Sequence, residues 1–261
     1  MTATADRGGW PQLPKCIGDA LMLNSRSCVF PPETAVTSPL ENMPSPRIAL
    51  IHATPVAIEP IVDAFRQLWP EARITNLLED SLPADLAADG RLTEKMVARF
   101  VTLARYTYDN GADAILFTCS AFGPAIEAAR AALPIPVLKP NEAMLEEALA
   151  AGTRIGLIAT FEPSLPALET EIRQQAKEKN RAVTISSRAV PAALVALHAG
   201  KSYEHNRLIA AAAEEIGDCD ALILAQFSMA SAAAVIESRI GRKVLTSPTS
   251  AVIRLKRLLS G

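Results

Sequence analysis

The chain has 261 residues, of which 49% are hydrophobic and 21% are charged, a composition typical of one large or two small globular domains. The formal net charge is −2 and the Lys and Arg residues are scattered along the chain, which argues against a nucleic-acid partner. No apolar run approaches the ~18 residues that a membrane-spanning helix needs, so we expect no membrane segment.

The cysteines and histidines do not predict a metal site. The four cysteines, Cys16, Cys28, Cys119 and Cys219, show no CxxC or metal-ligand spacing, and the chain has only three histidines. We therefore predict no bound metal, and a reducing cytoplasmic location.

Residues 1–45 differ from the rest of the chain, because they are polar, contain Pro, Ser and Gly throughout and show no sustained periodicity. The apolar patch at 20–23 is too short for the hydrophobic region of a signal peptide and lacks a basic flank. We predict a loosely ordered extension, in which Met43 is a second candidate for the natural start.

From residue 46 onward, strand and helix patterns alternate. Apolar residues at three- and four-residue spacing, such as Ile58, Ile61 and Phe65, predict a helix after the first strand. The polar stretch 79–91 is expected to be a loop, and Asn110-Gly111 is expected to end the next helix. The first half is thus predicted to hold strands at 48–52, 73–77, 114–117 and 137–139, with helices at 58–68, 92–110, 124–133 and one ending near 152.

The second half repeats this order. His198 and His205 lie in the region that links its second strand to the following helix, and we expect both at the surface. Strands that alternate with helices of this length predict parallel sheets with right-handed crossovers. The expected strands are 154–159, 182–187, the segment ending at 226, and 243–246, with helices at 165–179, 203–217, 231–240 and 251–259.

One spacing relates the two halves. The segment 113–123 resembles 220–230, which places Cys119 opposite Gln226 at an offset of 107 (226 − 119). The same offset aligns Arg47-Ile-Ala-Leu-Ile with Arg154-Ile-Gly-Leu-Ile, and Val137-Leu with Val244-Leu. Three gap-free matches predict two copies of a β/α unit of small-domain size.

The predicted fold class is α/β, with two pseudo-symmetric parallel-sheet domains of the flavodoxin-like or Rossmann-like type. The first domain is expected at 46–150 and the second at 151–261, with the first and last helices able to cross over between them. Like loops would then face each other across a shared cleft, a common place for ligands.

Cys119 is the strongest functional candidate. The apolar run 114–117 is continuous, as in a strand buried on both faces, and it stops at Thr118-Cys119-Ser120 just before a helical pattern. Open α/β sheets bind ligands at the carboxyl ends of their strands, and backbone N–H groups at a helix start favour a thiolate. The alternative is a buried cysteine that acts only as a small apolar residue.

These motifs resemble the aspartate/glutamate racemase superfamily, which includes hydantoin racemases, maleate isomerases and arylmalonate decarboxylases. The resemblance covers residues 47 to about 258 and rests on Thr118-Cys119-Ser120, on the Ala159-Thr160 turn and on the internal repeat. It implies an enzyme without a cofactor, in which two thiols on opposite faces of a carbon next to a carboxylate remove and return a proton.

The chain departs from that pattern where the second thiol is expected. Gln226 occupies the position, and an amide has no usable proton to exchange near neutral pH. Cys219 lies before the strand, at its wrong end. A one-thiol isomerase, decarboxylase of a substituted malonate or hydrolase remains open, as do a racemase with His52 or Glu142 on the far face and an inactive binding or regulatory homologue.

The resemblance also implies a small carboxylate substrate and a homo-oligomer, either a dimer or a tetramer. Thr54 and Thr160 end paired strands and are expected either to bind the carboxylate or to cap the following helices. Lys139 is a further candidate partner for an anionic substrate. The catalytic candidates are Cys119 and Gln226, and the substrate-binding candidates are Thr54, Pro55, Ser120, Ala121, Asn141, Thr160, Phe227 and Ser228.

Overall fold

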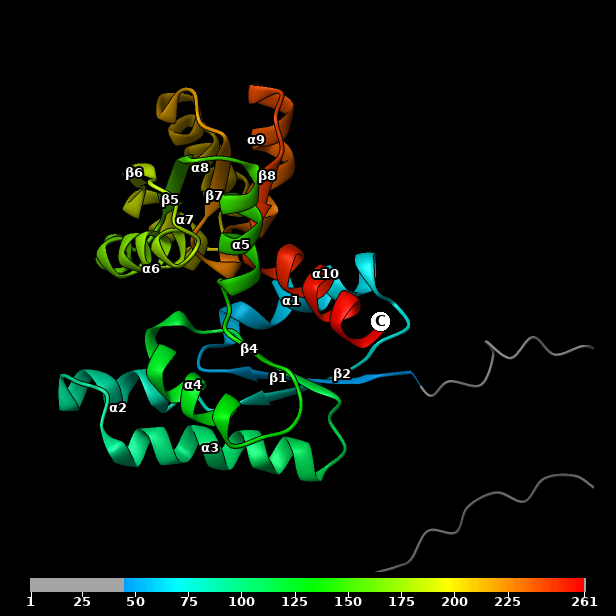
Figure 1. Ribbon diagram of the computed structural model, residues 1–261. Coiled ribbons are helices and arrows are strands. Elements are labelled where there is room, and N and C mark those ends of the chain that lie inside the picture. The colour runs from blue at the N-terminus through cyan, green and yellow to red at the C-terminus, as the bar shows by residue number, and fades with distance from the viewer. Residues whose placement is uncertain (1–44, 261) are drawn as a thin grey trace, which may run out of the picture. The chain divides into compact units, whose positions relative to one another are not determined.

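The computed structural model describes residues 45–260, and Figure 1 shows their helices and strands. The predicted extension at 1–45, with Cys16, Cys28 and Met43, lies outside the described residues apart from its last position. That prediction therefore stays untested.

The described residues form two four-stranded sheets, in the orders β2-β1-β3-β4 and β6-β5-β7-β8. Every strand pair is parallel, which confirms the predicted α/β class. We call the first sheet with its covering helices the first lobe and the second sheet with its helices the second lobe. The strands are β1 (Arg47–His52), β2 (Arg73–Leu78), β3 (Ala114–Phe117), β4 (Val137–Leu138), β5 (Arg154–Ala159), β6 (Thr184–Ala189), β7 (Ala221–Leu224) and β8 (Val244–Thr246).

The strand register repeats at the spacing read from the sequence. Ile51 pairs with Phe117 in the first sheet, and Ile158 pairs with Leu224 in the second, so both partners shift by 107. An aspartate carboxylate accepts the backbone N–H of the first residue in each leading strand, Asp113 at 2.7 Å and Asp220 at 2.8 Å. The predicted repeat is therefore confirmed in the pairing of the strands.

Helices cover both faces of the first sheet. On one face, Phe100 and Phe122 pack with Ile51 and Phe117, while on the other Phe65 packs with Leu50. The first face carries α2 (Leu82–Asp89), α3 (Glu94–Asp109) and α4 (Gly123–Ala131), and the second carries α1 (Ile58–Leu68) and α10 (Ser247–Ser260).

The second sheet is covered in the same way. Leu145 and Ile172 pack on one face with Leu157, and Ile209 and Ile236 pack on the other. The first of these faces carries α5 (Glu142–Ala151) and α6 (Leu165–Glu178), and the other carries α7 (Pro191–His198), α8 (Ser202–Ile216) and α9 (Ala233–Ile240).

The two lobes exchange the helices that follow their last strands. Helix α5 follows β4 of the first lobe but packs in the core of the second, and α10 follows β8 but packs beside α1 in the first (Figure 1). The two exchanged helices contact each other, and at their starts the Ser247 hydroxyl donates to Asn141 Oδ1 at 2.7 Å. This exchange joins the two hydrophobic cores.

Three local expectations were wrong. The stretch 79–91 contains helix α2, which has a proline in its first turn and ends at Gly90 in the left-handed conformation (φ 65°). Helix α7 was missed before α8. Because α7 covers it, His205 is fully buried, with Nδ1 2.9 Å from the Ala193 carbonyl oxygen, whereas His198 is exposed as expected.

Short 3₁₀ turns follow the inner strands of both sheets, where the sequence patterns predicted only loops. They are η2 (Pro55–Ala57), η3 (Ser120–Phe122), η4 (Glu162–Ser164) and η5 (Phe227–Ala232). None of the helices between residues 45 and 260 is long and apolar enough to cross a membrane.

Candidate active site

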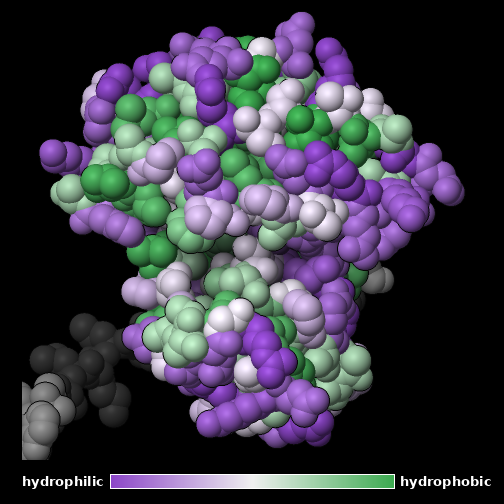
Figure 2. Space-filling view, turned by 90° about the vertical axis from the view of Figure 1, so that its left-hand side faces the viewer, coloured by the Kyte–Doolittle hydropathy of each residue, from purple (hydrophilic) through white to green (hydrophobic). Residues whose placement is uncertain are grey.

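The candidate site is formed by the loops that follow β1, β3, β5 and β7. In a sheet of order β2-β1-β3-β4 the connections diverge between β1 and β3, and ligands of open α/β sheets bind at that switch point. The second sheet repeats this arrangement between β5 and β7. Turns η2 and η5, from different lobes, contact each other, so the loops of the two sheets meet. In Figure 2 the surface is hollowed across the middle of the face shown, with hydrophobic and hydrophilic residues at its edges.

Cys119 lies at the carboxyl end of β3, as predicted, and is the N-cap residue of η3. It is half-buried and packs against the core cluster of the first lobe that includes Phe122. Burial raises the pKa of its thiol, and the backbone N–H of Ala121, which bonds to the sulfur, only partly offsets this effect. The expected thiolate is therefore not favoured, because loss of solvent outweighs the donors of a single short turn.

Gln226 lies at the matching end of β7, and its side chain is held by its own lobe. Its Oε1 accepts from the Thr160 backbone N–H at 2.9 Å and from the Thr160 hydroxyl at 3.3 Å. Its Nε2 donates to the Ser164 hydroxyl at 3.0 Å. The oxygen and the nitrogen of the amide both have hydrogen-bond partners, so the Gln226 side chain is held in one position. Ser164 was not a predicted site residue, although it is the last residue of η4, the turn after β5.

The remaining first-lobe candidates lie on the surface of the loops. Thr54 is half-buried and precedes η2 in an extended conformation, and its hydroxyl does not cap the helix that follows. The helix-capping alternative for Thr54 is therefore not realised. Pro55, Ser120 and Ala121 are exposed. These positions leave hydroxyl and backbone groups open to a ligand beside Cys119.

Three other candidates take part in packing. Phe227 is buried in the core of the first lobe, next to residues of α1 and α10, and Ser228 beside it is half-buried. Asn141 is buried at the crossing of α5 and α10, where Ser247 occupies its Oδ1. Contact of these three residues with a substrate stays a prediction.

His52 does not serve as a proton carrier for the far face. Its side chain is fully buried, with Nδ1 2.9 Å from the Thr118 hydroxyl and Nε2 3.0 Å from Asn76 Oδ1. Burial lowers the pKa of His52 more than the Asn76 bond raises it, so the imidazole is neutral at physiological pH. Asn76 was missed because nothing near it in the sequence points to His52.

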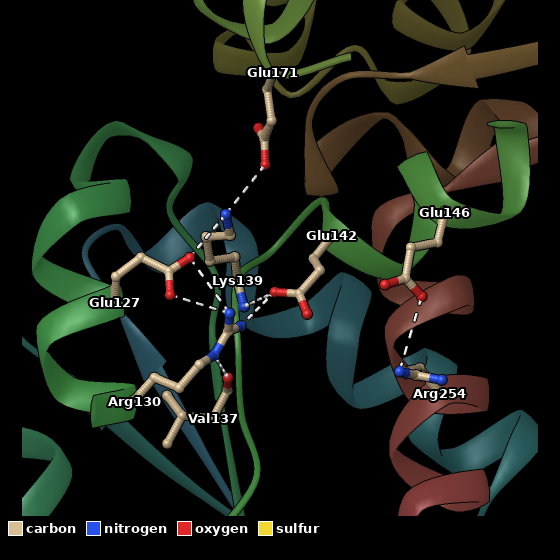
Figure 3. A network of polar contacts seen from close by, with 8 residues as sticks. All are labelled: Glu127, Arg130, Val137, Lys139, Glu142, Glu146, Glu171 and Arg254. Atoms are coloured by element: carbon tan, nitrogen blue, oxygen red, sulfur yellow. Dashed lines mark hydrogen bonds and ion pairs between the residues drawn. The ribbon is translucent and has the colours of Figure 1, made fainter. Parts of the chain in front are cut away.

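Lys139 and Glu142 belong to an ionic network that links the two lobes (Figure 3). Lys139 Nζ lies 3.0 Å from Glu127 of α4 and 3.7 Å from Glu171 of α6. Arg130 bonds to Glu127 at 3.1 Å and also pairs with Glu142. Three carboxylates thus surround two cations, and neither Lys139 nor Glu142 is free to bind an anionic substrate or to carry its proton.

Burial of Glu171 makes stability depend on pH. Burial raises its pKa above the ordinary 4.5, although the Lys139 ammonium lowers it. The native state therefore binds this proton more tightly than the unfolded chain, and the resulting stabilisation is complete below pH 4.5 and is lost as pH rises through the native pKa. We expect the Tm of Glu171→Gln to rise relative to that of the unmodified protein as pH increases from 4.5 to 7.5, measured by circular dichroism.

The exposed Glu178 on the same helix supplies a matched control for this experiment. Glu178→Gln is expected to keep the pH dependence of the unmodified protein. An equal change in Tm between pH 4.5 and 7.5 for the unmodified protein and for Glu171→Gln would contradict the assignment.

The sequence pattern of the Asp/Glu/Hydantoin racemase family matches residues 54–255, well over half of the chain. The chain belongs to the Asp/Glu/hydantoin racemase family. The matched region covers the strand-end loops from Thr54 onward, the whole of α5, and α10 as far as Leu255. The recognition made from Thr118-Cys119-Ser120 and the repeat is thereby confirmed at the level of the family. No curated protein is similar enough in sequence to be matched.

Solved structures with this racemase fold include enzymes of several types. Allantoin racemase from Klebsiella pneumoniae is 20% identical, with a TM-score of 0.60 over 83% of this chain and 88% of that one. An aspartate racemase homologue from Pyrococcus horikoshii OT3 is 15% identical, with a TM-score of 0.64 over 84% and 100%. Unliganded arylmalonate decarboxylase is 20% identical, with a TM-score of 0.56 over 83% and 94%. At these identities the likeness establishes the fold.

Proposed function

We propose that the protein is a cofactor-independent enzyme that acts at the carbon next to a carboxylate or carbonyl of a small acid, with Cys119 as the proton carrier for one face. The observation that carries this proposal is the contrast between the two strand ends. A half-buried thiol stands at the end of β3, whereas an amide with both ends bonded stands at the end of β7. One face of the substrate α-carbon can receive a proton from sulfur, and the opposite face cannot.

The chemistry follows from this asymmetry. The neutral Cys119 thiol gives its proton to a carbanion or enediolate at the α-carbon, and the sulfur becomes a thiolate. In an isomerase-type reaction the sulfur first takes the α-proton as a thiolate, and the thiol so formed returns a proton, on the same face, to a second carbon that shares the negative charge. In a decarboxylation the carbanion arises when carbon dioxide leaves, and the thiolate regains its proton from water. General acid–base steps of this kind contribute typically ~10²–10⁴-fold to a rate.

The substrate is proposed to be held without a cationic side chain. The loops at 52–57, 118–124, 159–165 and 225–232 contain no Lys or Arg. The hydroxyls of Thr54 and Ser120 and nearby backbone N–H groups are the donors left for a carboxylate. The names of the similar structures and of the family suggest a first panel of allantoin, hydantoins, aspartate, glutamate and arylmalonates.

Solvent exchange distinguishes one-faced from two-faced proton transfer. With a single enantiomer of each chiral panel compound in deuterated water, we expect the α-hydrogen to exchange at least ~10-fold faster than the configuration inverts. Proton NMR follows the exchange and chiral chromatography follows the inversion. Equal rates of α-hydrogen exchange and of inversion of configuration would show a second proton carrier and would contradict the proposal.

A decarboxylase is the second candidate, and the raised pKa of Cys119 favours it, because a protonated thiol is suited to giving a proton rather than taking one. An arylmalonate would then release carbon dioxide, and its product would carry one deuterium in a single configuration. A binding or regulatory homologue would show neither exchange nor release of carbon dioxide with any compound. Cytoplasmic location and homo-oligomeric assembly stay predictions.

A further inference from the structure

The two strand ends differ in a second respect, which concerns the residues beside the catalytic position. In the first lobe His52, Thr118 and Asn76 form a hydrogen-bonded chain that joins the ends of β1 and β3 to Asn76 within β2. The positions that correspond to His52 and Thr118 at the offset of 107 are Ala159 and Ala225, which are buried and apolar.

Asn76 also lacks a counterpart that reaches the strand end. Asn76 pairs with Leu50, and the matching Leu157 pairs with Ser187. The Ser187 hydroxyl instead donates to Glu169 of α6 at 2.6 Å. The polar chain therefore occurs only in the lobe that carries the thiol, although both lobes build the same strand end.

A buried polar chain is costly unless every group is paired, so a fold that closes one strand end with alanines does not need it at the other. The His52 side chain is fully buried and the Thr118 side chain is 7% exposed, yet both hydrogen-bond. Fold stability alone does not explain why one lobe has hydrogen-bonded polar residues where the other has alanines. The first lobe differs from the second in that Cys119 lies next to these residues.

The hydrogen-bonded side chains of His52, Thr118 and Asn76 act on the backbone next to Cys119 rather than on its sulfur. Side chains alternate along a strand, and Thr118 follows Phe117, which packs in the same cluster as Cys119. Thr118 therefore points to the opposite face of the sheet from Cys119. Its hydroxyl is fixed by His52 on the neighbouring strand, and its backbone N–H donates to the Ile51 carbonyl at 3.0 Å.

We propose that His52 is a positioning residue for Cys119, which holds Thr118 and so keeps the sulfur in its half-buried place at the end of β3. In this arrangement Nε2–H of the neutral imidazole donates to Asn76 Oδ1, and the Thr118 hydroxyl donates to Nδ1. Asn76 thereby selects the tautomer whose free nitrogen accepts the threonine hydroxyl. The lowered pKa of His52 agrees with a neutral ring.

The test measures the reactivity of Cys119 in the full chain, which requires no substrate. Iodoacetamide alkylation is followed as a function of pH, and mass spectrometry separates the peptide of Cys119 from those of the other cysteines. The variants are His52→Ala, Thr118→Val, which keeps the shape but removes the hydroxyl, and Thr118→Ser, which keeps the hydroxyl. His205→Ala is the matched control, because His205 is equally buried but lies in the second lobe.

Loss of the hydrogen bond between His52 and Thr118 is expected to admit water to the Cys119 sulfur. Because burial raises the pKa of this thiol, the pKa should then fall. The midpoint of alkylation should fall by about one pH unit in His52→Ala and Thr118→Val, with a roughly tenfold faster rate at pH 7. Thr118→Ser and His205→Ala should keep the midpoint of the unmodified protein. Thermal unfolding is measured in parallel for all four variants.

A lowered Tm with an unchanged midpoint of Cys119 alkylation in Thr118→Val would show that these hydrogen bonds only stabilise the fold. That result would overturn the proposal. The same conclusion would follow if His205→Ala moved the midpoint as far as Thr118→Val. If His52→Ala does not fold, Thr118→Val decides the question alone. The inference rests on the proposed role of Cys119 in catalysis, but its readout is independent, since an inactive Cys119 would still report its own position.

Discussion

Replacement of Cys119 by serine is expected to lower kcat/KM by about 10²–10⁴-fold on the substrate that the exchange assay identifies, while the fold remains intact. A hydroxyl occupies the same place, but its proton is far less acidic than that of a thiol, so transfer to a carbanion slows. Because the loss arises in the proton-transfer step, we expect it in kcat more than in KM. Steady-state kinetics and the deuterium-exchange rate both measure the effect.

Cys219→Ser provides the matched control, because Cys219 is also half-buried but precedes β7, at the end of the sheet away from the loops. Its kinetics should equal those of the unmodified protein. Full activity of Cys119→Ser would remove the residue from the mechanism, whatever the behaviour of Cys219→Ser.

Replacement of Phe122 by alanine is expected to lower the free energy of unfolding by about 3–5 kcal/mol. Phe122 is the last residue of η3 and is fully buried, with its ring centroid 4.9 Å from that of Phe100. Phe100 in turn stacks on Phe117 at 5.2 Å, so one aromatic cluster joins the turn after Cys119 to the strand before it. Urea denaturation followed by circular dichroism measures the change.

The same substitution should also make Cys119 more reactive, since the turn that shields the sulfur loses its anchor in the core. Phe161→Ala is the control, because Phe161 is 52% exposed in the loop after β5. Its removal should change the free energy of unfolding by no more than about 0.5 kcal/mol. Similar losses for the two variants would show that Phe122 does not anchor η3.

The repeat, the class of fold and the place of Cys119 were predictable from the sequence because each depends on local patterns. A continuous apolar run that stops at Thr118-Cys119-Ser120 marks a strand end wherever the strand lies in the sheet. The gap-free offset of 107 then predicts that Gln226 lies at the equivalent strand end, and this prediction requires no knowledge of contacts. The register of both sheets confirms that offset.

What remained hidden depends on contacts between distant residues. Asn76 and His52 are 24 positions apart and meet only because β1 and β2 pair, and Asn141 meets Ser247 at a separation of 106. His205 looked like a surface residue because the helix that covers it had not been recognised. No pattern within a short window contains this information.

The expected thiolate shows how a local rule can be outweighed by the surroundings. A cysteine before a helix start receives N–H donors in any α/β sheet, and Ala121 does supply one. The aromatic cluster beneath the turn then removes solvent from the sulfur, and this effect is the larger of the two. The balance between them depends on packing, which the spacing of residues does not reveal.

The exchange of α5 and α10 affects how the protein is made. Strand β1 begins at Arg47 and α1 follows it directly, whereas α10, which covers the same face of the sheet together with α1, begins at Ser247, which is 200 positions after Arg47 (247 − 47). At a synthesis rate of ~5–20 residues per second, the nascent first half waits on the order of 10–40 s with Leu50 and its neighbours partly uncovered. The ribosome must therefore release nearly the whole chain before either half is complete, so the two halves finish folding together.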